Sequence, residues 1–316
     1  MVDIGTPPGD GFAAPRSINA SGQITGSTGP GGDNGTSGVF VYSNGSFTYL
    51  GTLGGNSGIG NGINASGQVA GYSTNAAGTY RAFISKGDKL VDIGDLGGGT
   101  AVAYAINDAG AVVGSSVTAD GSNHPFLYSN GKMIDLGTLG SPQGSEWWNS
   151  EEGINKAGVV VGQSYTNRNN SPLLGFAWYR GKMIALGSLG GDMSQAYAIN
   201  NRNQVTGIAY LANGSAHAFI TDAAGKMHDL GSLAQYGASW GFGINDSGVV
   251  VGQAQTNNGA VHAFVSDGKK MQDLNNLVPK NSLILIEAES VNNAGQIVCT
   301  GEDSNGNLHA VLLTPQ

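Results

Sequence analysis

Residues 62–71 read GINASGQVAG, and this phrase decides the fold because it returns seven times along the chain. Each copy has a small residue, an isoleucine or valine and an asparagine, followed by a turn and then by Val/Ile-x-Gly. The last copy, at 290–301, carries an extra residue or a shift after Val298. The asparagines of the seven copies are Asn19, Asn64, Asn107, Asn155, Asn200, Asn245 and Asn292. They stand 43 to 48 residues apart, a repeat length that indicates a propeller or a solenoid.

Each repeat contains four short runs that predict β-strands. In the fifth repeat these runs are Gln195–Asn200, Asn203–Tyr210, His217–Asp222 and Lys226–Gly231, separated by residues that favour tight turns. The runs are rich in β-branched and aromatic residues, and no stretch keeps a helical period long enough to predict a helix. Four antiparallel strands in a repeat of about 45 residues are typical of one β-propeller blade.

Seven repeats therefore predict an all-β, seven-bladed β-propeller that forms a single domain over residues 1–316. The predicted blades are 12–53, 57–96, 100–139, 146–189, 193–233, 237–277, and 284–313 together with 1–5. The last blade combines both ends, because Val2-Asp3-Ile4-Gly5 matches a fourth strand and the chain ends in a third strand, 309–313. Pairing the two ends would close the ring and remove two exposed sheet edges.

The composition argues against several classes of protein. Charged residues make up 11% of the chain and the formal net charge is −8, so we expect no nucleic-acid partner. Cys299 is the single cysteine, which rules out an intrachain disulfide and a cysteine metal cluster. No apolar run approaches the roughly 18 residues of a membrane helix, so we expect no membrane span. We also expect a monomer and no cofactor.

The third strands of five repeats begin with related tripeptides. They read Arg-Ala-Phe from Arg81, His-Pro-Phe from His124, His-Ala-Phe from His217 and His262, and His-Ala-Val from His309. Gly38-Val39-Phe40 and Gly175-Phe176-Ala177 depart from this pattern. Over essentially its whole length the chain resembles the HAF extracellular repeat family of bacteria, which is named for this tripeptide. The resemblance implies an extracellular or periplasmic location, but no established reaction and no catalytic residues. Because residues 1–5 already match a fourth strand, we expect a mature domain without its signal peptide.

Residues that recur in most repeats are interpreted as structural. We expect the repeated asparagines to bond the backbone of the turn that follows them. Aspartates end five fourth strands, where we expect them to bond the amides of the next turn: Asp3, Asp92, Asp135, Asp229 and Asp273. Histidines open four third strands: His124, His217, His262 and His309. Equivalent positions lie around a ring and cannot converge on one ion, so we expect hydrogen-bonded histidines and no metal site.

Function is expected where the repeats differ from one another. The first strand of a blade is innermost, so residues just before the asparagine phrase face one mouth of the central channel. Two residues before the motif Ile or Val, the repeats carry Arg16, Asn61, Tyr104, Glu152, Tyr197, Phe242 and Glu289. Four residues before it, they carry Ala14, Ile59, Val102, Ser150, Gln195, Trp240 and Glu287. The alternative is drift at solvated positions, with the aromatic side chains packing between blades.

The loop that leads into the fourth repeat adds paired aromatic and acidic residues. It carries Trp147 and Trp148, followed by Glu151 and Glu152. Exposed aromatic rings on loops mark binding surfaces, and flat rings beside carboxylates suit the faces of sugars. The alternative is that one tryptophan simply plugs the channel mouth.

Three functions stay open at this point. The first is binding of a glycan or another small ligand of neutral charge at the channel mouth. The second is a glycosidase, or less readily a polysaccharide lyase, with Glu152 and Glu289 as acid and base across the channel. The third is a protein-interaction or surface scaffold. In each case we expect Arg16 of the first blade to lie beside the seventh blade and to pair with Glu289.

Overall fold

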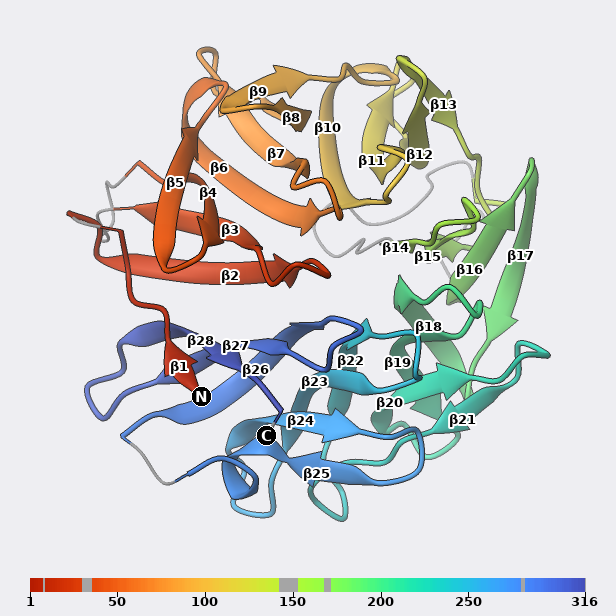
Figure 1. The fold of residues 1–316 in the computed structure, drawn as a ribbon. Helices are drawn as coiled ribbons and strands as arrows, with labels where there is room; N and C mark the ends of the chain where they lie inside the picture. Colours follow the sequence, from red (N-terminus) through yellow and green to blue (C-terminus); the bar gives the residue numbers. More distant parts are fainter. Residues whose placement is uncertain (8, 30–35, 142–152, 168–171, 280–281, 316) are drawn as a thin grey trace.

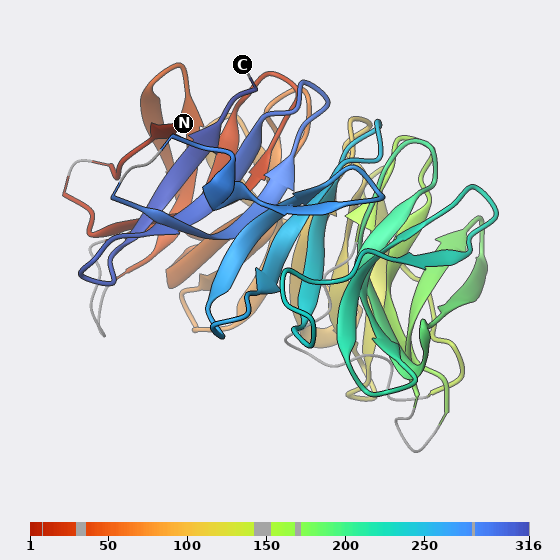
Figure 2. The ribbon, with the colours of Figure 1, turned by 90° about the horizontal axis from the view of Figure 1, so that it is seen from below.

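The computed structural model describes residues 1–7, 9–29, 36–141, 153–167, 172–279 and 282–315. These residues form seven four-stranded antiparallel sheets that are arranged in a ring (Figure 1). Seen from below, the sheets follow one another as blades around the ring (Figure 2). The predicted seven-bladed β-propeller is therefore confirmed. In the described part of the chain the one helical element is a 3₁₀ turn, Leu274–Asn276, and no helix is long and apolar enough to cross a membrane.

In blades one to six the four strands follow one another in chain order from the channel outward. In blade seven three strands do so, and β1 from the start of the chain is the outermost strand. The first three blades are β2 (Phe12–Ile18), β3 (Ile24–Gly29), β4 (Gly38–Ser43) and β5 (Ser46–Gly51); β6 (Gly54–Ile63), β7 (Val69–Asn75), β8 (Tyr80–Lys86) and β9 (Lys89–Asp92); and β10 (Gly97–Ile106), β11 (Val112–Thr118), β12 (Asn123–Ser129) and β13 (Lys132–Asp135). The next two are β14 (Gly153–Ile154), β15 (Val160–Tyr165), β16 (Leu173–Tyr179) and β17 (Lys182–Gly187); and β18 (Gly190–Ile199), β19 (Val205–Leu211), β20 (Ala216–Thr221) and β21 (Met227–Asp229). The last two are β22 (Ser239–Ile244), β23 (Val250–Gln255), β24 (Val261–Ser266) and β25 (Met271–Asp273); and β26 (Ile284–Val291), β27 (Ile297–Glu302), β28 (Leu308–Leu313) and β1 (Val2–Asp3).

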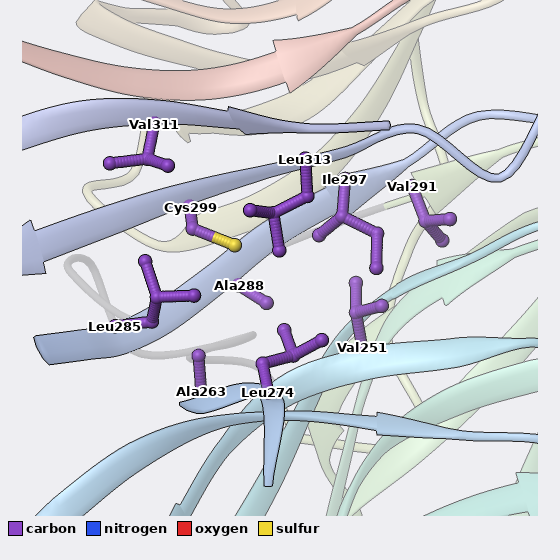
Figure 3. Close-up of a cluster of buried hydrophobic side chains, with 10 residues drawn as sticks. All are labelled: Val251, Ala263, Leu274, Leu285, Ala288, Val291, Ile297, Cys299, Val311 and Leu313. Carbon is purple, nitrogen blue, oxygen red and sulfur yellow. The ribbon is translucent and has the colours of Figure 1, made fainter. Parts of the chain in front are cut away.

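The hydrophobic core lies between neighbouring blades. One phenylalanine of each third strand in blades one to six has no exposed surface: Phe40, Phe83, Phe126, Phe176, Phe219 and Phe264. Phe126 of blade three packs in one cluster with Ala70 and Ala82 of blade two. Figure 3 shows the interface between blades six and seven, where Val311 takes the place of the phenylalanine and lies in one cluster with Leu285 of blade seven and Ala263 of blade six. The phenylalanine of the repeated tripeptide therefore seals the joint between two blades.

The departure from the tripeptide in blade four is a shift of one residue in how the sequence is aligned with the other blades. Phe176 pairs with Gly162 in the way that Phe83 pairs with Gly71. The tripeptide in register in blade four is thus Leu174-Gly175-Phe176, and its phenylalanine is kept. The shift expected after Val298 is also explained, because Cys299 takes the place of the motif glycine without an inserted residue and pairs with Ala288 and Val311.

The two chain ends close the ring as expected. β1 pairs with β28, with Val2 opposite Leu312 and Asp3 opposite Val311, and Figure 1 shows the N-terminal strand beside β28. The Ile4 amide also donates to the Ala310 carbonyl at 2.9 Å. A side-chain contact reinforces this pairing, since His309 Nδ1 lies 2.8 Å from the Asp3 carboxylate.

The repeated histidines bond to the repeated aspartates of their own blades. The pairs are His124–Asp135, His217–Asp229, His262–Asp273 and His309–Asp3, with Nδ1 to oxygen distances of 2.7 to 2.9 Å. In blade two Arg81 takes the place of histidine and contacts Asp92 at 2.8 Å. Each aspartate also accepts a backbone amide of the next turn, as Asp229 does from Gly231 at 2.7 Å. Both predicted roles are confirmed, and together they fasten the short outer strand to the third strand.

Deleting residues 1–5 is expected to lower the melting temperature markedly. The deletion removes β1 and leaves β28 as an exposed edge, and it breaks the joint between the first and last blades. A matched control is His228→Ala, which breaks the exposed His228–Asp222 pair and leaves the ring closed. An unchanged melting temperature after the deletion would contradict a stabilising role of this closure.

Replacing His217 by alanine is expected to cost about 1 kcal/mol at neutral pH, a modest value because the Asp229 carboxylate is partly exposed. Burial alone would raise the pKa of Asp229, but hydrogen bonds from His217 and the Gly231 amide lower it below the ordinary value of 3.8. The native state therefore holds this proton less tightly than the unfolded chain, so the stabilisation is present above about pH 4 and is lost as the pH falls through the lowered pKa. Urea unfolding at pH 7 and pH 3 checks this, and an equal cost at both values would contradict it.

Candidate functional site

The repeated asparagines form a closed circle of hydrogen bonds around the channel. Each Nδ2 donates to the backbone carbonyl of the repeated asparagine in the next blade, at 2.9 to 3.2 Å. The last step of the circle runs from Asn292 back to Asn19 at 3.0 Å. The sequence predicted bonds to the local turn, but it gave no sign of this second role between blades.

The side-chain Oδ1 of each repeated asparagine accepts hydrogen bonds from backbone amides of the turn that follows it. Oδ1 of Asn107, for example, accepts the amides of Ala109 at 3.1 Å and Ala111 at 3.0 Å. The local task needs an acceptor and the task between blades needs a donor, and an amide side chain provides both. An aspartate would lack the donor, and a serine would be too short to reach both partners.

Asn107→Ala is expected to cost about 2–3 kcal/mol, because it leaves two turn amides without their acceptor and removes one of two hydrogen bonds to the Asn155 carbonyl. Asn213→Ala serves as the control, since Asn213 only accepts the Ser215 amide at an exposed hairpin tip. We expect that control to change stability by no more than about 0.5 kcal/mol. Equal effects of the two variants in chemical unfolding would show that the circle adds no stability.

A ring of apolar side chains lies next to the asparagine circle. It is formed by the motif residues Ile18, Ile63, Ile106, Ile154, Ile199, Ile244 and Val291. This Ile/Val ring lies between two cavities, and six of its members line both of them. We name the larger one, of about 330 Å³, the bulge cavity and the smaller one, of about 210 Å³, the asparagine cavity.

The bulge cavity owes its wall to a break in the regular strand pairing. In six blades the residue two before the Ile/Val ring has no partner on the second strand, while its neighbours on both sides do. These extra residues are Arg16, Asn61, Tyr104, Tyr197, Phe242 and Glu289, and all six line the cavity. A β-bulge of this kind redirects a side chain and is common beside functional sites.

The repeated glycine of the second strand makes room for the bulge. A Cβ atom on Gly26 would lie 2.0 Å from the Ala14 carbonyl oxygen, and one on Gly71 would lie 2.0 Å from that of Ile59. The same carbonyl, four residues before the ring, approaches the glycine in blades three, five and six. Blade seven has Cys299 at this position, and β26 there shows a second register shift between Leu285 and Glu287. In blades one, two, three, five and six the close approach of this carbonyl thus leaves no room for a Cβ atom at the repeated glycine.

One side of the bulge cavity is aromatic. The rings of Tyr197 and Phe242 stack with their centroids 6.0 Å apart and an angle of 25° between their planes. Tyr104 of blade three also lines the cavity. These three side chains are half-buried, so part of each ring is available to a ligand.

The opposite side of the cavity is polar. Arg16 of blade one and Glu289 of blade seven form an ion pair at 3.3 Å, as expected from ring closure. Asn61, which also lines the cavity, donates from Nδ2 to the Ala103 carbonyl at 2.8 Å. Tyr72, from the second strand of blade two, completes this wall, and burial raises the pKa of its hydroxyl, so that the group stays neutral. Arg16 and Glu289 are the charged side chains among the described lining residues, and their charges cancel.

The structure brings together six of the predicted site residues. Trp240 and Glu287, which precede the bulge residues of their strands by two positions, do not belong to the described lining of the cavity, whereas Ile59 at the equivalent position of blade two does. The predicted residues Trp147, Trp148, Glu151 and Glu152 lie outside the described residues, and so does the proposed pairing of Glu152 with Glu289.

Tyr72 is the lining residue that sequence reasoning missed. The sequence does distinguish Tyr72 from the other repeats, because none of the equivalent second-strand residues is aromatic: Ser27, Ser115, Ile208, Gln253 and Thr300. The predicted site residues all come from first strands or from the loops before them, whereas Tyr72 lies on a second strand. A second-strand side chain reaches the cavity here because it is large.

The asparagine cavity on the other side of the ring is built from repeated contacts. At four of the seven steps, the side chain of the residue after the repeated asparagine accepts a hydrogen bond from a backbone amide of the preceding blade. One example is the bond from the Asn201 amide to Asp246 Oδ1 at 2.9 Å. Lys156 and Asp108 form an ion pair there at 3.3 Å. Among the described residues, no group of three His, Cys, Asp or Glu side chains is placed to hold a metal ion.

No protein-family model matches the chain, and no curated protein matches its sequence. The chain is similar to three solved structures, a chain from a study of two prolyl endopeptidases (12% identity, TM-score 0.61, 99% of this chain and 51% of that one), BP39L lectin from Burkholderia pseudomallei (11%, 0.52, 93% and 92%) and TolB from Acinetobacter baumannii (9%, 0.49, 89% and 60%). The chain thus spans about half of the endopeptidase chain and 60% of the TolB chain. Identities this low bear on the fold alone.

Proposed function

We propose that this propeller binds a neutral glycan in the bulge cavity. The observation that carries the proposal is the pairing of an aromatic wall with a polar wall that has no net charge. A sugar ring presents C–H groups on its faces and hydroxyls around its edge, so it matches such a pair of walls. The cavity volume of about 330 Å³ lies at the lower end of the range of small-ligand sites.

The two walls would hold the ligand by different interactions. The Tyr197–Phe242 stack offers a rigid apolar surface on which a sugar face can pack, at little cost in side-chain freedom. Arg16, Glu289 and Asn61 offer donors and acceptors at known positions, because the ion pair and the bond to Ala103 fix their side chains. Hydrogen bonds with charged groups are stronger than those between neutral groups, so this wall would fix the orientation of the hydroxyls.

The charge distribution favours a neutral ligand over an acidic one. Glu289 cancels the charge of Arg16, the one cation in the described lining. The whole chain carries a formal charge of −8, which repels a polyanion. A polysaccharide lyase acting on uronates would need several cations around the substrate carboxylate. The fold is compatible with sugar binding, since one of the structural neighbours is a lectin.

We further propose that the chain belongs to the HAF extracellular repeat family and acts outside the cell or in the periplasm. The repeated His-Ala-Phe tripeptide supports this assignment. The structure gives the tripeptide a physical reason, because its histidine fastens the outer strand and its phenylalanine seals the joint to the next blade.

Phe242→Ala is expected to weaken glycan binding by about 10- to 100-fold, or about 1–3 kcal/mol, because it removes one ring of the Tyr197–Phe242 stack. The measurement is a glycan array followed by calorimetry with the best ligand. Tyr236→Ala is the control, since Tyr236 is an aromatic residue in the connection that leads into the same blade, is 84% exposed and lies outside the cavity lining. Equal binding by wild type, Phe242→Ala and Tyr236→Ala would place the site elsewhere.

The second candidate function is glycan hydrolysis, which is favoured by the presence of the Glu289 carboxylate in the cavity wall. Glu289→Gln separates the two functions when reducing-sugar release is measured beside binding. A binder is expected to show no sugar release and a modest loss of affinity, whereas a glycosidase would lose turnover by about 100-fold or more. Glu302→Gln, on β27 of the same blade and outside the cavity lining, is the control. If neither glycan binding nor hydrolysis is found, the third function, a protein-interaction scaffold, takes their place.

A further inference from the structure

We propose that the asparagine cavity holds a second binding site, in which the backbone amides of Ala20 and Asn293 donate to the amide carbonyl oxygens of a small neutral ligand. The site is separate from the proposed glycan site in the bulge cavity. The feature that carries the inference is a gap in the hydrogen bonds between what we call the tip residues, which follow the repeated asparagines and all line the asparagine cavity: Ala20, Ala65, Asp108, Lys156, Asn201, Asp246 and Asn293.

The bonds at the other tips show what such an amide accepts as a partner. At four of the seven steps, the backbone amide of one tip residue donates to the side chain of the next tip residue, at 2.8 to 3.0 Å. The acceptor is Oδ1 of an aspartate or an asparagine in every case: Asp108, Asn201, Asp246 and Asn293. By the equivalence of the repeats, a tip amide points along the ring toward the place of the next tip side chain.

The gap lies where two tip side chains carry no oxygen atom. Ala20 follows Asn293 around the ring and Ala65 follows Ala20, so neither methyl group can accept the amide before it. In the part of the chain that the structure describes, no protein group accepts the amide of Ala20 or that of Asn293. The step from Asp108 to Lys156 lacks the amide bond too, but the ion pair of these side chains bridges it. Two neighbouring backbone donors are therefore left at the joint of blades seven, one and two.

The space beside these donors suits two carbonyl oxygens of one ligand. The alanine side chains at positions 20 and 65 leave open the places that aspartate or asparagine oxygens occupy in the other blades. A backbone amide is a strong donor that is rarely left without an acceptor, and a carbonyl oxygen is the acceptor it meets most often in proteins. A ligand with two amide groups would thus restore, from outside, the contacts that the two alanines leave out.

The charges around the cavity favour a neutral ligand. The tip residues carry two carboxylates, Asp108 and Asp246, and one ammonium group, that of Lys156, which pairs with Asp108. Burial alone would raise the pKa of Asp246, but hydrogen bonds from Asn201 and Asn293 lower it below the ordinary value of 3.8. Asp246 therefore stays ionised at neutral pH, and its carboxylate lies 2.8 Å from the side-chain nitrogen of Asn293. A carboxylate ligand beside Asn293 would meet a charge of its own sign.

The first test follows the backbone amide resonances of the whole chain by NMR while succinamide, which has two neutral amide groups, is added. We expect saturable shifts at Ala20 and Asn293, and unchanged resonances at Ala65 and Asn201, whose amides already have acceptors. Succinate has the same carbon skeleton with two carboxylates, and it should bind at least 10-fold more weakly. No saturable shift at Ala20 and Asn293, or equal binding of succinate, would overturn the proposal.

The second test fills the gap from within the protein. Ala20→Asn offers an acceptor to the Asn293 amide, and Ala65→Asn offers one to the Ala20 amide. The double variant is expected to lose succinamide affinity by at least 10-fold and to melt at a higher temperature, because two donors gain a partner. Each single variant is measured as well, so that the comparison survives if the double variant does not fold.

Ala223→Asn is the matched control for the second test. Ala223 takes the same position after Asp222 that Ala20 takes after Asn19, in a turn closed by the same backbone and side-chain bonds, but it lies outside the cavity lining. This variant should bind succinamide as the wild type does. Undiminished binding by the variants at positions 20 and 65, or an equal loss in the control, would overturn the site.

Discussion

The circle of hydrogen bonds from one repeated asparagine to the next is the constraint on which the rest of the structure depends. Each of these side chains closes its own turn through Oδ1 and fixes the neighbouring blade through Nδ2. The same residue therefore sets both the path of one blade and its distance from the next. Because the residue just before each asparagine is the ring isoleucine or valine, the circle also fixes the place of the Ile/Val ring that lines the channel.

A second constraint connects the repeat to the site. In blades one, two, three, five and six the bulge in the first strand brings one carbonyl so close to the second strand that the facing residue has to be glycine. Blade seven has the bulge with Cys299 at this position, and its first strand carries a second register shift. The bulged residue itself is released from the ladder, and this is the position at which Arg16, Asn61, Tyr104, Tyr197, Phe242 and Glu289 differ in size and charge. The bulge is therefore the reason both for the repeated glycine on the second strand and for the variety of the bulged residue on the first strand.

The repeat spacing and the matching half-blades at the two ends were enough to predict the fold, its closure and the contact between Arg16 and Glu289. The bulge was not predictable, because an interrupted pairing appears in one sequence only as a slipped alternation.

The two mouths of the channel differ in how their variable residues are bonded. On the asparagine side, the residues after the repeated asparagines bond between blades at four steps, where Asp108, Asn201, Asp246 and Asn293 each present an acceptor. A change there disturbs two blades at once. On the bulge side, the extra residue forms no ladder bond, so its replacement alters the cavity wall while the strand pairing stays intact. The bulge residues can therefore differ in size and charge without loss of the blades.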